Sequence, residues 1–200
     1  SKKGSEKYLL MSLLWTSFMR KLVPYLFICL VVAVFLSPLF QNPSGHLQDQ
    51  DWFQVASFYF SSKHTVQEHK ELPLWTPYFA GGFYMAGHPE DVSFSPLFLL
   101  ILVFGEVVGL KIIALLMYCI GGCSMFHLLT NHLRFRSAAG LFAALTFVLS
   151  GLFSHHLIDG NFHSEILFLL LPLCTIYILN AHHRKRYIFF SSFLLAIILM

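Results

Sequence analysis

Charged side chains are scarce in this 200-residue chain, because Asp, Glu, Lys and Arg together supply 12% of the residues, about half the ~25% of a soluble domain. Hydrophobic residues reach 56%, and phenylalanine alone occurs 22 times. A water-soluble fold of this size needs more polar side chains to cover its surface. The composition therefore excludes a soluble globular domain, a disordered chain and a nucleic-acid-binding protein.

Cysteine is also sparse. The four cysteines, Cys29, Cys119, Cys123 and Cys174, all lie inside apolar runs, which argues against a disulfide framework and against a zinc ribbon. Cys119 and Cys123 are four residues apart and share one helix face. Small, apolar packing is their simplest role, with a redox or metal role as the alternative. The chain also lacks the GxxxxGK[ST] motif that cradles nucleotide phosphates.

Long apolar runs dominate what is present. A bilayer core is ~30 Å thick, and a helix needs ~20 apolar residues to cross it. Five runs approach this length, at residues 22–40, 112–129, 137–153, 166–180 and 187–200. The sequence therefore predicts an all-α, polytopic transmembrane fold with about five spans. Because the last run stops with the chain and the first residue is not Met, we expect a piece of a longer protein.

The charges alternate between the two sides of these spans. Ten of the 13 Lys and Arg residues precede the first span or follow the second and the fourth, whereas most acids lie between spans one and two. By the positive-inside rule the N-terminus is cytoplasmic, with residues 1–21 as an interfacial segment and 22–200 as the transmembrane part. The short apolar stretch 96–104 is then expected to lie on the outer leaflet. A short second span is the alternative.

The long outer loop, residues 41–95, is rich in aromatic residues and is predicted to be a folded segment that contacts the membrane surface. Within it, residues 52–60 fit an amphipathic interfacial helix. Asp49 and Asp51 open the loop just past the first span. A partly desolvated carboxylate there could act as a general base or bind a cation. The alternative is an ordinary solvated start of a loop.

A motif rich in proline and glycine follows in the same loop. Residues 72–82 read Leu-Pro-Leu-Trp-Thr-Pro-Tyr-Phe-Ala-Gly-Gly, followed by Pro89-Glu90 and Ser95-Pro96-Leu97. Together with the acid after the first span, this order resembles the YfhO-like bacterial membrane proteins, of the GT-C class of glycosyltransferases. Weaker matches continue over residues 149–151, 160–161 and 171–173. The family often has Gly-His where this chain has Gly160-Asn161, although His163 lies two residues further on.

The resemblance implies a reaction on the extracytoplasmic face of the cytoplasmic (inner) membrane. A sugar would pass from a polyprenyl-phosphate donor to a glycan, a cell-wall polymer or a lipid. Asp51 stands where the family's catalytic Asp is expected, with Asp49 as the second choice, and a divalent metal ion (Mg or Mn) could assist. A non-catalytic lipid or glycan transporter with the outer loop as its gate is the alternative function.

Substrate-binding candidates come from the same outer segments. Those in the long loop are Trp75, Tyr78, His88, Glu90 and Asp91, and those elsewhere are Lys111, Asp159 and His163. Asp159 and His163 belong to a cluster with His155, His156 and Glu165, which could line a groove with Asp51, bind a metal or be a solvated loop. Lys111, near the outer end of its span, could meet a lipid phosphate or extend to the interface without a ligand.

Overall fold

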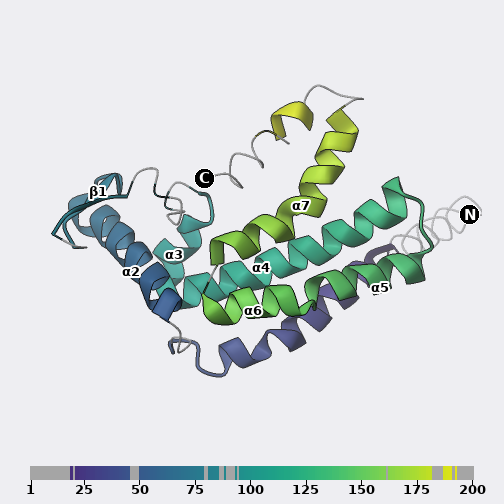
Figure 1. The fold of residues 1–200 in the computed structure, drawn as a ribbon, viewed down its shortest axis with the longest axis horizontal. Coiled ribbons are helices and arrows are strands. Elements are labelled where there is room, and N and C mark those ends of the chain that lie inside the picture. The colour runs from purple at the N-terminus through teal and green to yellow at the C-terminus, as the bar shows by residue number, and fades with distance from the viewer. Residues whose placement is uncertain are drawn as a thin grey trace, which may run out of the picture.

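The computed structural model describes residues 19, 21–45, 50–78, 81–85, 88, 93, 95–160, 162–181, 187–190 and 192. For residues 50 and 162–167 it describes the backbone alone. The described part is mostly helical, which confirms the predicted class (Figure 1). The expected interfacial segment at residues 1–18 and most of the run 187–200 lie outside the described residues.

The described part begins with a helix at Lys21–Phe35, which is followed by a short 3-10 turn at Ser37–Phe40. Helix α2 (Gln50–His64) continues into a π-turn (Thr65–His69) and is followed by a two-stranded hairpin, β1 (Trp75–Thr76) with β2 (Phe83–Tyr84). The remaining elements are α3 (Phe98–Phe104), α4 (Glu106–His127) with a π-turn at Leu128–His132, α5 (Ser137–Val148), α6 (Gly151–Asp159) and α7 (Phe162–Ala181).

Helix α4 is the centre of the molecule, and α3, α5 and α7 all pack against it. Two adjacent glycines allow close neighbours on two sides of α4. A Cβ at Gly121 would lie 3.0 Å from the backbone oxygen of Leu169 in α7, and one at Gly122 would lie 2.7 Å from Cγ2 of Ile28 in the first helix. Small residues that let helix backbones approach are typical of membrane helix packing.

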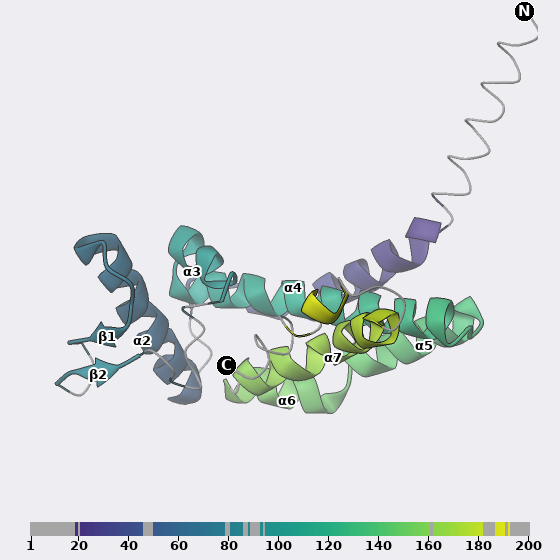
Figure 2. The same ribbon diagram turned by 90° about the horizontal axis from the view of Figure 1, so that it is seen from above.

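Successive apolar helices run in alternating directions along one axis (Figures 1 and 2). Among the described residues, two helices are long and apolar enough to cross a bilayer, Glu106–His132 and Ser137–Asp159. Two others, Lys21–Phe35 and Phe168–Ala181, are shorter. Five spans are thus not confirmed. Only 22% of the most apolar window of Ser137–Asp159 is buried, whereas the core helix of a soluble protein is buried on most sides.

The predicted span boundaries need two corrections. The first helix ends at Phe35 rather than residue 40, because Pro38 opens a 3-10 turn, and proline does not continue an α-helix. The span predicted at 137–153 is part of the longer apolar stretch Ser137–Asp159, which is divided into α5 and α6 at Ser150, where the backbone is extended with ψ 143°.

The outer loop is anchored to the helical core through α2, which contains the helix expected at residues 52–60. Trp52, Val55, Phe58 and Tyr59 are buried along one face of α2, and the helix packs against α3, α4 and α6. The stretch at 96–104 forms α3, a seven-residue helix that is too short to span a bilayer. Gly105, at φ +85°, turns the chain from α3 into α4.

Candidate functional site

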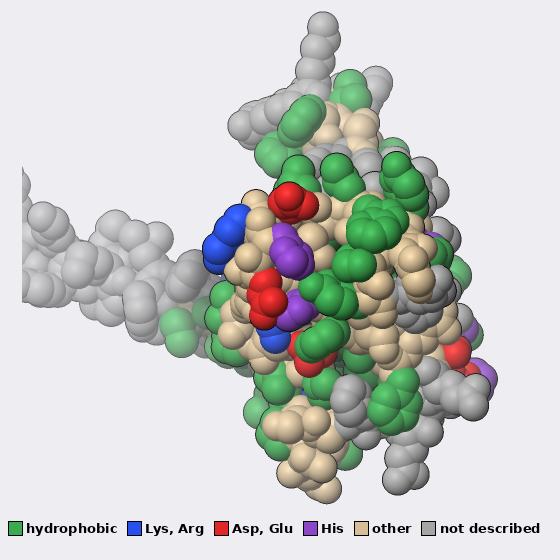
Figure 3. All heavy atoms as spheres, turned by 90° about the vertical axis from the view of Figure 1, so that its left-hand side faces the viewer, with side chains coloured by type: hydrophobic (Ala, Val, Ile, Leu, Met, Phe, Trp, Pro, Cys, Tyr) green, Lys and Arg blue, Asp and Glu red, His purple; other side chains and the backbone are tan. Residues whose placement is uncertain are grey.

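The candidate site lies at the end of the molecule formed by α2, the hairpin and the first turns of α4. Figure 3 shows histidine side chains beside acidic and basic ones on this end. The C-terminal end of α6 and the N-terminal end of α7, which the charge pattern predicts to be on the outer side, lie toward the same side of the molecule as α2 (Figure 1). The extracytoplasmic segments expected from the charge pattern are therefore on one end of the fold.

The start of α2 is fixed in place by its contact with the end of α6. Trp52 is 1% exposed, and its indole Nε1–H donates a hydrogen bond of 2.7 Å to the carbonyl of Leu157. Leu157 belongs to the last turn of α6, whose carbonyls lack partners within the helix. The chain leaves α6 through Gly160 at φ +82°, a left-handed conformation that glycine adopts without strain.

Gly160 also allows the two segments to touch. A Cβ at this position would lie 2.5 Å from the backbone nitrogen of Trp52 and 2.9 Å from the carbonyl carbon of Asp51. The structure thus brings the backbone of Asp51, the predicted catalytic residue, against the chain at the end of α6. Asp51 itself is exposed in the first turn of α2, where the helix dipole favours its negative charge.

Asp159 is the last residue of α6, and its side chain is described by the structure. Its carboxylate lies 3.1 Å from Nε2 of His155, one helical turn earlier, and both side chains are exposed. Asn161 and the second-choice acid Asp49 lie outside the described residues, as do Glu90 and Asp91, and His163 is described by its backbone alone. The described part of the site is therefore Asp51, whose backbone adjoins Gly160, and the His155–Asp159 pair in the last turns of α6.

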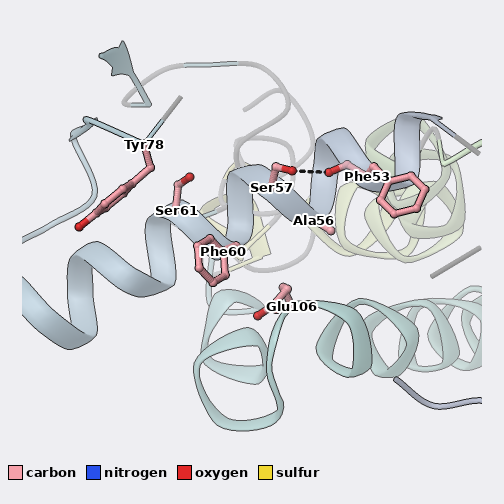
Figure 4. A pocket seen from close by; sticks show the side chains of 7 residues that line it. All are labelled: Phe53, Ala56, Ser57, Phe60, Ser61, Tyr78 and Glu106. Atoms are coloured by element: carbon pink, nitrogen blue, oxygen red, sulfur yellow. Dashed lines mark hydrogen bonds between the residues drawn. The ribbon is translucent and has the colours of Figure 1, made fainter. Parts of the chain in front are cut away.

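A separate groove of about 400 Å³ runs along another face of α2. Figure 4 shows Tyr78 of the loop on one side of the helix and Glu106, the first residue of α4, on the other. The lining residues are Phe53, Ala56, Ser57, Phe60, Ser61, Tyr78 and Glu106. Aromatic rings, hydroxyl groups and one carboxylate in an open groove are chemically suited to a polar ring compound such as a sugar.

Polar contacts hold the walls of this groove. The carboxylate of Glu106 lies 3.1 Å from the ammonium of Lys63, and Ser57 donates a hydrogen bond of 2.6 Å to the carbonyl of Phe53. The hydroxyl of Tyr78 is 2.9 Å from Nε2 of His69. The ring of Tyr78 also packs edge-on against His64, at 4.8 Å between centroids. These contacts tie the loop after β1 to the end of α2.

The structure divides the predicted site into two. Trp75 and Tyr78 belong to the loop over the C-terminal half of α2, and the ring of His88 packs between Phe58 and Phe83 at 5.0 and 5.1 Å. The groove begins at Phe53, two residues after Asp51, and extends to Ser61, which is ten residues or ~15 Å further along the helix than Asp51. Asp51 is thus not among the lining residues and lies beyond the Phe53 end of the groove.

Lys111 is placed differently from either sequence expectation. Its side chain is 1% exposed, and its ammonium donates hydrogen bonds of 2.7, 3.0 and 2.7 Å to the carbonyls of Asn42, Pro43 and Gly45. All three N–H donors of the ammonium are therefore satisfied by backbone. The proposed phosphate contact of Lys111 is replaced by a structural role, in which it holds the turn after the first helix.

A metal site for Mg or Mn needs several oxygen or nitrogen ligands close together. Among the described residues, no group of three His, Cys, Asp or Glu side chains is close enough to hold a metal ion. His155 and Asp159 form a pair, with the backbone of Asp51 nearby. The described side chains of His155 and Asp159 do not by themselves form a complete Mg or Mn site.

Sequence reasoning missed the groove residues Ser57, Ser61 and Glu106, as well as His69. A helical projection of residues 50–64 carried the missing signal, because Phe53, Ser57 and Phe60 recur at helical spacing on the side opposite Tyr59. Glu106 gave no such signal, because only the packing of α2 against α4 brings it to this face.

No protein-family model matches this chain, and neither a curated protein nor a solved structure matches it. A function for the chain therefore has to be argued from its own residues and geometry.

Proposed function

We propose that this chain belongs to a membrane glycosyltransferase that transfers a sugar from a polyprenyl-phosphate donor on the extracytoplasmic face, with Asp51 as the general base. The observation that carries the proposal is the placement of Asp51. It is an exposed carboxylate on a helix whose first turn is fixed to the neighbouring outer segment by the Trp52–Leu157 hydrogen bond and the close fit at Gly160. The resemblance of residues 72–82 to the YfhO-like family supports the same assignment.

The proposed chemistry needs a base at a fixed position. A hydroxyl oxygen of the acceptor attacks the anomeric carbon of the donor sugar, and the bond from that carbon to the phosphate oxygen breaks. The hydroxyl proton passes to the carboxylate of Asp51, and polyprenyl phosphate leaves. Proton transfer to a positioned side chain contributes typically ~10²–10⁴-fold to rate. The His155–Asp159 pair supplies further hydrogen-bonding groups beside the reacting sugar.

The membrane arrangement proposed is the multi-pass one, with about five spans and a cytoplasmic N-terminus. It is supported by the alternating helix directions (Figure 1) and by large apolar side chains exposed along the helices, such as Leu30, Phe142, Leu152 and Ile178. Contiguous exposed apolar surface is typical of membrane contact. In this arrangement the lipid tail of the donor lies against the helices while its sugar reaches the end that carries Asp51.

We assign the groove along α2 to units of a glycan or cell-wall acceptor beyond the one that reacts. Its polar lining residues Ser57 and Ser61 lie ~9–15 Å from Asp51 along the helix, beyond the groove's nearer end at Phe53. Phe60 and Tyr78 can stack against the apolar face of a sugar ring, while Ser57, Ser61 and Glu106 can bind its hydroxyls.

The proposal is tested by sugar transfer in membranes that contain the complete protein. Labelled polyprenyl-phosphate sugars are supplied as donors, and wild type is compared with Asp51→Asn and with Glu71→Gln at matched expression. Glu71 is an exposed acid of the same loop and is the control. We expect transfer to be lost in Asp51→Asn and kept in Glu71→Gln. Equal activity in all three proteins would show that Asp51 is not the base.

A lipid or glycan transporter is the second candidate, because one polar network lies between the helices. The hydroxyl of Tyr25 is 3.1 Å from Nδ1 of His127, and the amide of Asn131 is 2.9 Å from the same nitrogen. Transporters concentrate polar groups near the bilayer midplane. His127 is near the end of the Glu106–His132 helix, which favours the enzyme. Donor-independent movement of lipid-linked sugar across vesicles would support the transporter instead.

A further inference from the structure

Two of the four cysteines meet at the contact between the first helix and α4. Sγ of Cys29 lies 3.7 Å from Sγ of Cys123. Cys119 is one helical turn before Cys123 on α4, and Cys174 is buried in α7. Cys29 and Cys123, with Cys119 one turn away, are here called the thiol cluster, and they have no role in the proposed sugar transfer.

The helix backbones are close together at the thiol cluster. Ile28 and Gly122, the neighbours of Cys29 and Cys123 in the sequence, are in direct contact, because Cγ2 of Ile28 occupies the space where a side chain at position 122 would begin. A disulfide requires Cα atoms ~4.4–6.8 Å apart and sulfurs ~2.05 Å apart. Two helices that meet through a glycine bring Cα atoms within this range most easily. Sγ of Cys29 and Sγ of Cys123, now 3.7 Å apart, would then reach bonding distance by rotation of the two side chains.

We propose that Cys29 and Cys123 form a reversible disulfide that ties the first helix to α4. Each thiol loses its hydrogen, and the two electrons and two protons pass to a membrane-permeable two-electron acceptor of the quinone or diazene class, while one S–S bond forms. A dithiol reductant reverses the reaction and is itself oxidised to a disulfide. The donor and acceptor sites are not involved, so this proposal is independent of the proposed function.

The bridge would fix a part of the fold that leads directly to the candidate site. It would join residues 94 apart in the chain. The first helix continues into the turn whose carbonyls bind Lys111 of α4, and from there into α2. Oxidation would therefore hold the first helix on α4 by a covalent bond, next to the turn after that helix, which the hydrogen bonds of Lys111 already hold on α4.

The test is a count of free thiols in the complete protein in membranes, before and after treatment with the diazene oxidant diamide. Remaining thiols are then labelled under denaturing conditions with a maleimide of high mass and counted by gel shift, and the bridged peptides are identified by mass spectrometry. We expect oxidation to remove two thiols, those of Cys29 and Cys123. The Cys174→Ser protein should lose the same pair, and Cys29→Ser and Cys123→Ser should lose none.

Three outcomes would overturn the assignment. They are an unchanged number of labelled thiols after oxidation of the wild type, a bridge that persists in Cys123→Ser, and a bridge that forms only between two molecules. Oxidation of the Cys174→Ser and wild-type proteins gives the answer even if a cluster variant fails to fold, since neither changes the thiol cluster. Treatment with dithiothreitol is expected to restore the number of thiols counted before oxidation, because the proposed bond is reversible.

Discussion

Replacement of Gly160 by alanine tests the contact that positions Asp51. Gly160 has φ +82°, and a Cβ there would lie 2.5 Å from the backbone nitrogen of Trp52. Both effects act against Gly160→Ala, because an L-residue is strained in the left-handed region and because the new methyl group meets backbone, which cannot move aside by a side-chain rotation.

The size of the effect follows from these two terms. The left-handed conformation costs alanine ~1–2 kcal/mol, and overpacking costs ~1–3 kcal/mol. Alanine also lowers the entropy of the unfolded chain, which offsets ~0.4–1 kcal/mol. We therefore expect Gly160→Ala to lower the free energy of unfolding by about 3 kcal/mol. If the start of α2 instead moves away from α6, the loss of that packing should lower the free energy of unfolding by a similar amount. For a chain of this length the melting temperature should fall by roughly 6–12 °C.

Gly151→Ala is the matched control. Gly151 begins α6 and does not have positive φ, and a Cβ added to it would meet no atom of the described residues within 4 Å. Alanine is favoured over glycine within a helix by ~0.5–1 kcal/mol. This variant should therefore melt at the wild-type temperature or slightly above it.

The assay is thermal unfolding of the purified protein in detergent, followed by sugar transfer below the melting temperature. We expect Gly160→Ala to reduce both the melting temperature and the transfer rate, because Asp51 loses its fixed position. Equal melting temperatures for Gly160→Ala and Gly151→Ala would refute the reasoning, since α2 would then not rest on the end of α6.

The remaining predictions concern single contacts. Lys111→Met should lower the free energy of unfolding by about 3 kcal/mol, since three backbone carbonyls lose a charged donor; an unchanged thermal melt would show that these hydrogen bonds do not hold the turn. Trp52→Phe keeps the buried ring but removes the bond to Leu157, and should cost ~1–2 kcal/mol in the same melt, with no change if that bond is unimportant. Tyr78→Ala, which removes the stacking ring, should raise KM for a polymer acceptor and leave kcat unchanged, and a lower kcat alone would exclude the groove as an acceptor site. Lys63→Gln should cost only ~0–1 kcal/mol, less at high salt, because its ion pair with Glu106 is partly exposed.

The class of fold could be read from the sequence because it depends on local properties. Apolar runs long enough to form helices, interrupted by charges and prolines, specify where helices begin and end. The helix expected at residues 52–60 and the short segment at 96–104 are both present, as α2 and α3. The five-span count went beyond this local signal, and within the described part of the chain two helices are long and apolar enough to span a bilayer.

The candidate site was only partly predictable. Asp51 and Asp159 were both identified, since an acid at the end of an apolar run is conspicuous in the sequence. Their relation was not fixed by the sequence, because it depends on the fit of Gly160 against α2. Tyr78 was named as a substrate-binding candidate without a position relative to Asp51, and the loop after β1 packs against the C-terminal half of α2 and places Tyr78 beside His69.

The helices, the alternation of charge between their ends and the apolar face of α2 each follow from residues that are near one another in the chain. Which partner each face meets depends instead on how distant segments pack in the folded protein. Lys111 shows the difference, since a lysine at the end of an apolar run is equally compatible with a phosphate, with water or with protein. Three carbonyls about 66–69 residues earlier in the chain bind it, and such contacts depend on packing between distant segments rather than on local pattern.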